Sequence, residues 1–153
     1  MALALYILSG IVAVFGVAIG IWQRRGLPES LSALAYVWGW WWTVWLWAVA
    51  FLQAPLLMER LGDGWAWLGF AMTAALVATG AWPLTDAGKV RWHYATGVAA
   101  WLAAAGVVCR LGAVGAVVLG AATVAVAVAR PRAWCLLLEV AAWAAMACCM
   151  AFG

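Results

Sequence analysis

Apolar residues fill most of the chain in long, nearly uncharged runs, and polar residues fall in short stretches between them. A helix needs about 20 apolar residues to cross about 30 Å of hydrocarbon. Runs of about that length recur from one end of the sequence to the other. The pattern predicts an all-α polytopic membrane protein, a bundle of six transmembrane helices forming one transmembrane domain over residues 1–153. The expected helices cover residues 2–22, 31–53, 64–82, 92–109, 111–129 and 133–152.

The fourth and fifth helices come from one apolar stretch, residues 92–129, which only Arg110 interrupts. A single helix of this length would extend roughly 57 Å, nearly two membrane widths. We therefore expect a hairpin at Arg110-Leu111-Gly112, with one long tilted helix as the alternative.

Prolines stand at the boundaries of the runs, where the missing N–H costs least. We interpret Pro55–Leu61 as a short interfacial helix, followed by a turn at Gly62-Asp63-Gly64.

The first run, Ala2–Trp22, lacks a basic leading segment and a small-residue cleavage site followed by a soluble domain. It is expected to be a retained helix rather than a signal peptide.

Composition supports a membrane environment, since 71% of the residues are hydrophobic and 8% are charged. Soluble domains carry about a quarter charged residues. The net charge of +3 comes from basic residues scattered at the edges of apolar runs. A nucleic-acid-binding protein would cluster them on one face. The expected partners are therefore membrane lipids, with a second copy or another membrane protein as further possibilities, and no nucleic acid.

Basic residues also predict the orientation. The loops after the first, third and fifth helices hold six of them, and the other loops hold Arg60 and Arg110. Cytoplasmic loops carry the excess of Lys and Arg. This rule places both termini outside the cytoplasm, in what we expect to be a bacterial inner membrane.

The first two cytoplasmic loops bring together four residues that suggest chemistry, and they are the catalytic candidates: Glu29, Ser30, Asp86 and His93. A histidine beside a carboxylate can act as a general base. The alternative is an interfacial His93 hydrogen-bonded to a loop carbonyl. Three nearby basic residues, Arg24, Lys89 and Arg91, are candidates for binding lipid headgroups.

Glu139 lies within the last apolar run, where a carboxylate is costly and usually faces the bundle interior or a watery cavity. It is a candidate for proton transfer, cation binding or substrate binding. Protonation, or pairing with a snorkelling Arg132 two turns earlier, is the alternative.

Tryptophan is unusually dense in the second run. Trp38, Trp41, Trp42 and Trp45 share the i, i+3, i+4, i+7 spacing of one helical stripe. A flat apolar ligand can stack on such a stripe, but packing against helices or lipid is the favoured interpretation. Tryptophans near run ends, such as Trp22 and Trp65, are typical of a membrane interface.

Other motifs are sparse. Gly16-x-x-x-Gly20 allows close helix packing, within the chain or between chains. The four cysteines form no C-x-x-C pair, and with one histidine the sequence predicts neither a metal site nor a cofactor. Standard catalytic motifs are missing.

Two local patterns carry a resemblance. One is Pro28-x-Ser30-x-Ser32 with Tyr36 after it, and the other is Gly80-Ala81-Trp82-Pro83 followed by His93-Tyr94. Together they resemble a group of small bacterial multi-pass membrane proteins, and are distantly similar to the six-helix DRAM/Sfk-like proteins. The resemblance implies a six-helix fold. It implies no enzymatic activity, because that group has none agreed.

Three functions follow from these observations. The leading hypothesis is a non-enzymatic membrane protein that acts through lipid or partner contacts at its cytoplasmic face. The second is an intramembrane lipid-modifying enzyme that uses the Glu29/Ser30/Asp86/His93 cluster. The third is a small oligomeric transporter or channel with Glu139 on its path.

Overall fold

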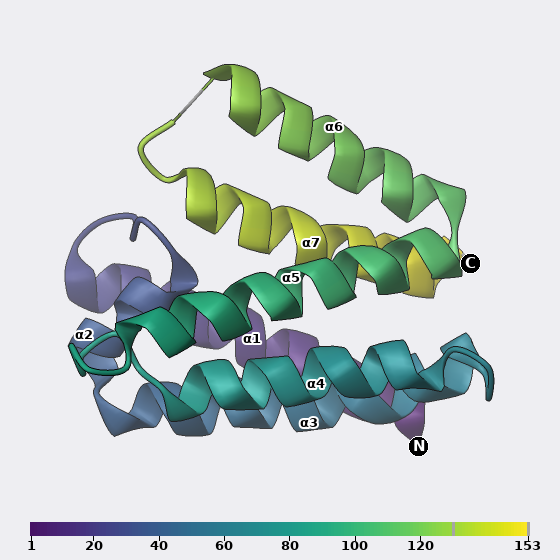
Figure 1. Cartoon of the computed structure of the whole chain (residues 1–153), viewed down its shortest axis with the longest axis horizontal. Helices are drawn as coiled ribbons and strands as arrows, with labels where there is room; N and C mark the ends of the chain where they lie inside the picture. Colours follow the sequence, from purple (N-terminus) through teal and green to yellow (C-terminus); the bar gives the residue numbers. More distant parts are fainter. Residues whose placement is uncertain (130, 153) are drawn as a thin grey trace.

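The computed structural model, shown in Figure 1, describes residues 1–129 and 131–152. All regular elements in this part of the chain are helical. They are listed here in chain order: α1 Ala2–Arg24, the 3₁₀ helix η1 Leu31–Leu34, α2 Ala35–Trp38, α3 Trp40–Leu61, α4 Ala66–Ala81, α5 Val90–Leu111, α6 Ala113–Ala129 and α7 Trp134–Phe152. The predicted all-α class is confirmed.

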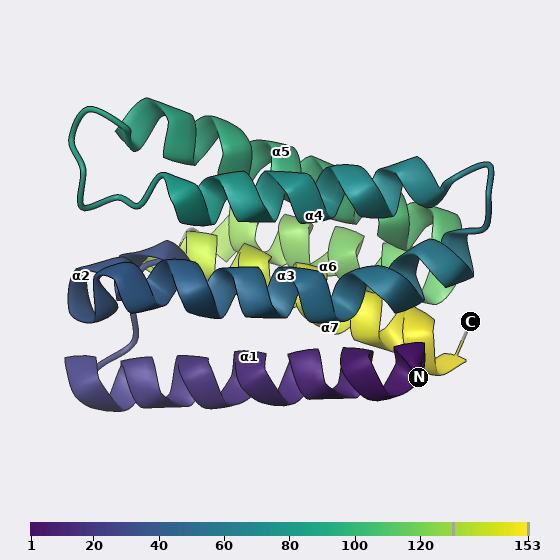
Figure 2. The same cartoon turned by 90° about the horizontal axis from the view of Figure 1, so that it is seen from below.

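Six long helices run roughly along one axis (Figures 1 and 2). Helix α1 packs against α3, α3 against α4, α4 against α5, α5 against α7, and α7 against α6. The two termini lie at the same end of the bundle (Figure 1). We call this the terminal end, and the opposite one the polar-loop end. The polar-loop end holds the connections α1–η1, α4–α5 and α6–α7.

Within the part of the chain that the structure describes, four helices are long and apolar enough to cross a membrane: α1, α3, α5 and the Trp134–Ala151 part of α7. Helices α4 and α6 are apolar but shorter, with 16 and 17 residues. At 1.5 Å per residue α4 is about 24 Å long, somewhat less than the hydrocarbon thickness. Large apolar side chains also cover the outside, including Phe15 on α1, Phe70 on α4 and Val117 on α6. Such a surface suits lipid rather than water.

The helix expected over residues 31–53 differs from the structure at both ends. It begins as η1 and α2, and it breaks at Gly39, whose φ of 57° favours glycine. Helix α3 then continues through Pro55 to Leu61, so the separate interfacial helix at Pro55–Leu61 was wrong. Pro55 removes one N–H from the helix interior, and α3 nevertheless continues across it.

The hairpin between the fourth and fifth predicted helices is confirmed, because α5 ends at Leu111 and α6 begins at Ala113 around Gly112. The alternative of one long helix is wrong. The remaining predicted helices agree with α1, α4, α5, α6 and α7 to within two residues at each end.

Small residues let the helices approach closely. A Cβ on Gly16 would overlap the Trp45 indole, and one on Gly20 would lie 2.6 Å from Leu34. Gly16 and Gly20 therefore pack α1 against α3 and η1 within the chain. Likewise a Cβ on Gly115 would overlap Cys149, where α6 meets α7.

Candidate functional site: a cavity around Glu139

A cavity of about 90 Å³ lies inside the bundle, between α3, α4, α5, α7 and η1. Most of its lining is apolar, such as Leu46, Met72 and Ala100. The polar exceptions include the side chains of Ser32, Thr79 and Glu139. We call it the Glu139 cavity. A space this large can hold about three waters or one small polar group.

Helical spacing explains why these residues face one space. Gly97, Ala100, Trp101 and Ala104 of α5 lie at i, i+3, i+4 and i+7. Glu139, Ala142, Trp143 and Met146 of α7 repeat the same spacing. Residues at these intervals lie on one side of a helix. Each helix thus presents one inward stripe to the cavity.

Glu139 accepts a hydrogen bond through Oε2 from the backbone N–H of Leu31, at 2.7 Å. Leu31 is the first residue of η1, whose N–H has no partner within its own helix. The carboxylate therefore connects α7 to η1 at the edge of the cavity. Arg132 is exposed and makes no ion pair with Glu139 within the described residues, where Lys89–Asp86 is the only ion pair.

Two further hydrogen bonds fix η1 over the cavity. Ser30 Oγ accepts from the backbone N–H of Ala33 and so caps η1. The backbone N–H of Leu136 donates to the carbonyl of Glu29 at 3.1 Å. The segment Glu29–Leu31 is therefore held along the first turns of α7, with Leu31 and Ser32 lining the cavity.

The indole N–H groups of two lining residues, Trp42 and Trp101, are buried and have no hydrogen-bond partner in the described part of the chain. The Trp42 side chain is only 1% exposed. Both nitrogens are covered by the atoms around them. Leaving such a donor unpaired costs about 1–3 kcal/mol.

Neighbouring tryptophans behave differently. Trp45 Nε1 donates to the carbonyl of Val12 on α1, at 2.9 Å, and Trp47 Nε1 donates to that of Val77 on α4, at 2.8 Å. Trp38 Nε1 donates to the Gln23 side chain at 2.7 Å. These indoles join α3 and α2 to their neighbours. The buried Trp42 N–H differs from these three in having no hydrogen-bond partner among the described residues.

The predicted tryptophan stripe forms only in part. Trp42 and Trp45 are buried with ring centroids 5.2 Å apart, and Trp38 meets Trp45 edge-on at 5.6 Å. Trp41 is 58% exposed and stacks on Trp40 instead. Trp41 lies on α3 together with Trp42 and Trp45, but it is on the side of this helix that the bundle leaves exposed.

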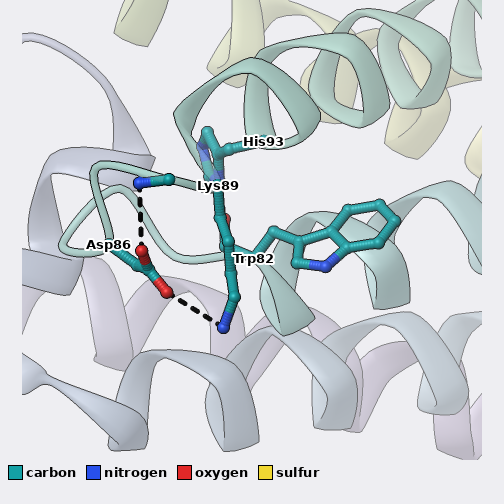
Figure 3. A network of polar contacts seen from close by, with 5 residues as sticks. Trp82, Asp86, Lys89 and His93 are labelled. Carbon is teal, nitrogen blue, oxygen red and sulfur yellow. Dashed lines mark hydrogen bonds and ion pairs between the residues drawn. The ribbon is translucent and has the colours of Figure 1, made fainter.

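His93 joins two helices at the polar-loop end (Figure 3). Its Nδ1 lies 2.7 Å from the Trp82 carbonyl and 3.2 Å from the Thr79 carbonyl. Both partners are acceptors, so Nδ1 carries the proton and donates. His93 is 3% exposed. This arrangement matches the interpretation of His93 as a residue bonded to a carbonyl.

The four catalytic candidates have separate partners. Asp86 accepts from Lys89 Nζ at 2.9 Å and from the Gly88 N–H at 3.1 Å (Figure 3). The Lys89 ammonium, with that N–H, holds the pKa of the Asp86 carboxyl below its usual value. Ser30 caps η1, and no two of Glu29, Ser30, Asp86 and His93 are hydrogen-bonded to each other. The structure provides no joined acid–base pair here.

The basic headgroup candidates lie together. All four are exposed at the polar-loop end. Arg24 is the last residue of α1, and Arg132 lies shortly before α7. Lys89 comes directly before α5, and Arg91 lies in the first turn of α5. Arg130 lies outside the described residues. Arg60 and Arg110 are at the opposite end, where Arg110 stacks over the Trp65 ring at 5.6 Å. The predicted gathering of basic residues at one end of the bundle is confirmed.

Sequence reasoning identified Glu139 and Trp42 but missed Trp101, Thr79 and Ser32. The spacing of Gly97, Ala100 and Ala104 could have shown the inward side of α5, and Trp101 with it. The depth of Thr79 depends on how α4 packs, which spacing alone does not give.

In the described residues there is no group of three His, Cys, Asp or Glu side chains able to hold a metal ion. No family model, curated protein or solved structure matches the chain.

Proposed function

We propose that the chain is a multi-pass protein of the bacterial inner membrane in which all six long helices span the bilayer. Both termini would then lie outside the cytoplasm and the polar-loop end inside. Helices α4 and α6 would span although they are short, with local thinning or tilt of the bilayer around them. The apolar exterior and the basic polar-loop end support this arrangement.

Within this frame, we infer that the protein binds the polar group of a lipid-like molecule in the Glu139 cavity, without transforming it. The observation that carries this proposal is the Glu139 carboxyl group in a mainly apolar cavity, where its Oε1 has no hydrogen-bond partner among the described residues. Binding sites are typically apolar cavities with a few converging polar groups. Lipids are the proposed partners, with a second copy or another membrane protein binding elsewhere.

The test uses three eight-carbon probes added to the purified protein in detergent: 1-octanol, octylammonium and octyl phosphate. Indole resonances of Trp42 and Trp101, assigned with Trp→Phe variants, report whether a probe enters the cavity that these two side chains line. We expect at least one probe to shift both resonances saturably. If none of the three does, the proposal is wrong.

A matched pair of variants controls for nonspecific partitioning. Gly97 lines the cavity and Gly120 lies on the exposed side of α6; a Cβ at either position meets no atom within 4 Å. Gly97→Leu should fill the cavity and abolish the shift. Gly120→Leu, the same change at the lipid-facing surface, should leave it intact.

The other two functions have less support. An enzyme needs its acid, base and nucleophile in contact, whereas Glu29, Ser30, Asp86 and His93 have separate partners. A channel needs a continuous polar lining, whereas the cavity lining around Glu139 is mainly apolar.

A further inference from the structure

One oxygen of the Glu139 carboxyl group has no partner in the protein. Oε2 accepts from the Leu31 N–H at 2.7 Å, whereas Oε1 accepts from no group among the described residues. Oε1 also differs from the unpaired indole nitrogens of Trp42 and Trp101, because those atoms are covered by their neighbours and Oε1 is not. Since Glu139 lines the cavity, a donor that enters the cavity has access to this oxygen.

The charge of the cavity has one sign. Of the described residues in its lining, Glu139 alone is ionisable. Arg132 is exposed and makes no ion pair with it. A carboxylate at membrane depth is costly unless it is paired. Within the described residues, a positive charge beside Glu139 must therefore come from a bound molecule.

Metal ions and phosphates match this cavity poorly. Ca²⁺ and Mg²⁺ take roughly six to eight oxygen ligands, but the side-chain oxygens of the described lining belong only to Ser32, Thr79 and Glu139. Thr79 Oγ1 is already engaged, because it donates to the Ala75 carbonyl at 2.8 Å. A phosphate would place a second negative charge beside the carboxylate.

A primary ammonium group matches the cavity better. It carries three N–H donors and one positive charge, so it can donate to Oε1 and neutralise the carboxylate at once. Ser32 offers a second acceptor, because it follows Leu31 in η1 and lines the same cavity. Hydrogen bonds between charged groups are roughly twice as strong as neutral ones. A hydroxyl group could also donate to Oε1, but it would leave the charge unbalanced.

We propose that the Glu139 cavity binds a primary ammonium group, the polar end of a long-chain amine or of an amine-bearing lipid. This inference rests on the proposed function and specifies its ligand class. The volume of about 90 Å³ is smaller than the roughly 150 Å³ cavity that holds a benzene ring. It therefore suits a headgroup of a few atoms, and a long apolar chain must extend outside the cavity.

The experiment compares octylammonium with 1-octanol and octyl phosphate at equal mole fraction in detergent, with the Trp42 and Trp101 indole resonances as the readout. We expect octylammonium to bind more tightly than either by about tenfold or more. Two further probes separate charge, donor and chain. Octyltrimethylammonium has the charge and the chain but no N–H donor, and methylammonium has the charge and the donor but no chain. Both should bind about tenfold more weakly than octylammonium.

Each outcome has a distinct meaning. Preference for 1-octanol or octyl phosphate overturns the ammonium assignment but leaves the binding function standing. Equal binding of octyltrimethylammonium overturns the role of the N–H donor, and equally tight binding of methylammonium overturns the lipid source. If no probe shifts the resonances, both the ligand class and the binding function fail.

Variants test the role of the carboxylate directly. Glu139→Gln removes the charge but keeps a carbonyl oxygen for the Leu31 N–H. It should weaken octylammonium by about tenfold or more and change 1-octanol by less than about threefold. Glu29→Gln is the matched control, because Glu29 is exposed and does not line the cavity, and it should leave both affinities unchanged. Unchanged octylammonium affinity in Glu139→Gln, or an equal loss in Glu29→Gln, would contradict the proposal.

A second cavity variant covers the case in which Glu139→Gln does not fold, which circular dichroism shows. Ser32→Ala removes the second acceptor and leaves the Leu31 N–H bonded to Glu139. It should weaken octylammonium by about threefold to tenfold. Full octylammonium affinity in Ser32→Ala would overturn this arrangement of acceptors.

Discussion

At the residue scale, the buried histidine has a structural explanation. His93 Nδ1–H donates to the carbonyls of Thr79 and Trp82, near the C-terminal end of α4, where carbonyls lack partners in the helix. This bond joins the start of α5 to the end of α4, so His93 positions the two helices rather than acting on a substrate.

Replacing His93 should therefore destabilise the fold. His93→Phe leaves two carbonyls without this donor and should lower the free energy of unfolding by about 1–3 kcal/mol. His93→Asn keeps a donor near the position of Nδ1 and should recover part of this loss. Thermal unfolding in detergent measures both. Equal stability of His93→Phe and the wild type would contradict this role.

Asp86 provides the contrast at the same loop. It is exposed and bonds only within its own turn, to Gly88 and Lys89. Asp86→Asn should change the free energy of unfolding by no more than about 0.5 kcal/mol, as is usual for surface substitutions. A loss as large as that of His93→Phe would show that Asp86 has a contact the structure lacks.

At the scale of elements, periodicity and hydropathy were sufficient for most helices, because apolar runs of membrane length have few alternatives. They failed between Leu31 and Leu61. There a single glycine at positive φ ends α2, and a proline is tolerated inside α3. Neither effect can be read from composition, because Gly and Pro are both frequent inside membrane helices.

The candidate site was predictable only in part, for a related reason. A lone carboxylate in an apolar run identified Glu139 directly. Its partner, the Leu31 N–H, is a backbone group more than a hundred residues away in sequence, and no side-chain pattern shows it. The two unpaired indoles likewise depend on which carbonyls the packed helices bring within reach.

Close packing of α1 against α3 gives a prediction with a matched control. A side chain at Gly16 would overlap Trp45, whereas Gly10, on the same helix, has open space around it. Gly16→Leu should displace Trp45 from the Val12 carbonyl and destabilise the fold by about 1–3 kcal/mol. Gly10→Leu should be close to neutral. Similar melting temperatures for both would mean that α1 is not packed this way.

At the scale of the whole molecule, the even number of long helices places both termini at one end (Figure 1). The basic residues at the other end predict which side of the membrane each end faces. Alkaline phosphatase is active only outside the cytoplasm, so its fusion to the C-terminus should show activity. A green fluorescent protein fused to the same terminus should not fluoresce. The reverse pattern would invert the topology.

The bundle as a whole combines a lipid-compatible exterior with a small, mainly apolar cavity that holds a carboxyl group. Several other interior polar groups are paired with backbone carbonyls, as Ser9 is with that of Val49 and Thr73 with that of Gly69. A third buried donor, Gln53 Nε2, is unpaired but lies away from the Glu139 cavity. The Glu139 carboxyl group in this cavity is therefore the feature that most calls for an occupant.

The most direct measurement is an experimental structure of the protein in lipid nanodiscs at a resolution that reveals bound lipids and waters. The account predicts density in the Glu139 cavity within about 3.2 Å of the Glu139 carboxyl group, continuing into an apolar chain outside it. An empty cavity, or one that holds only water, would contradict the account.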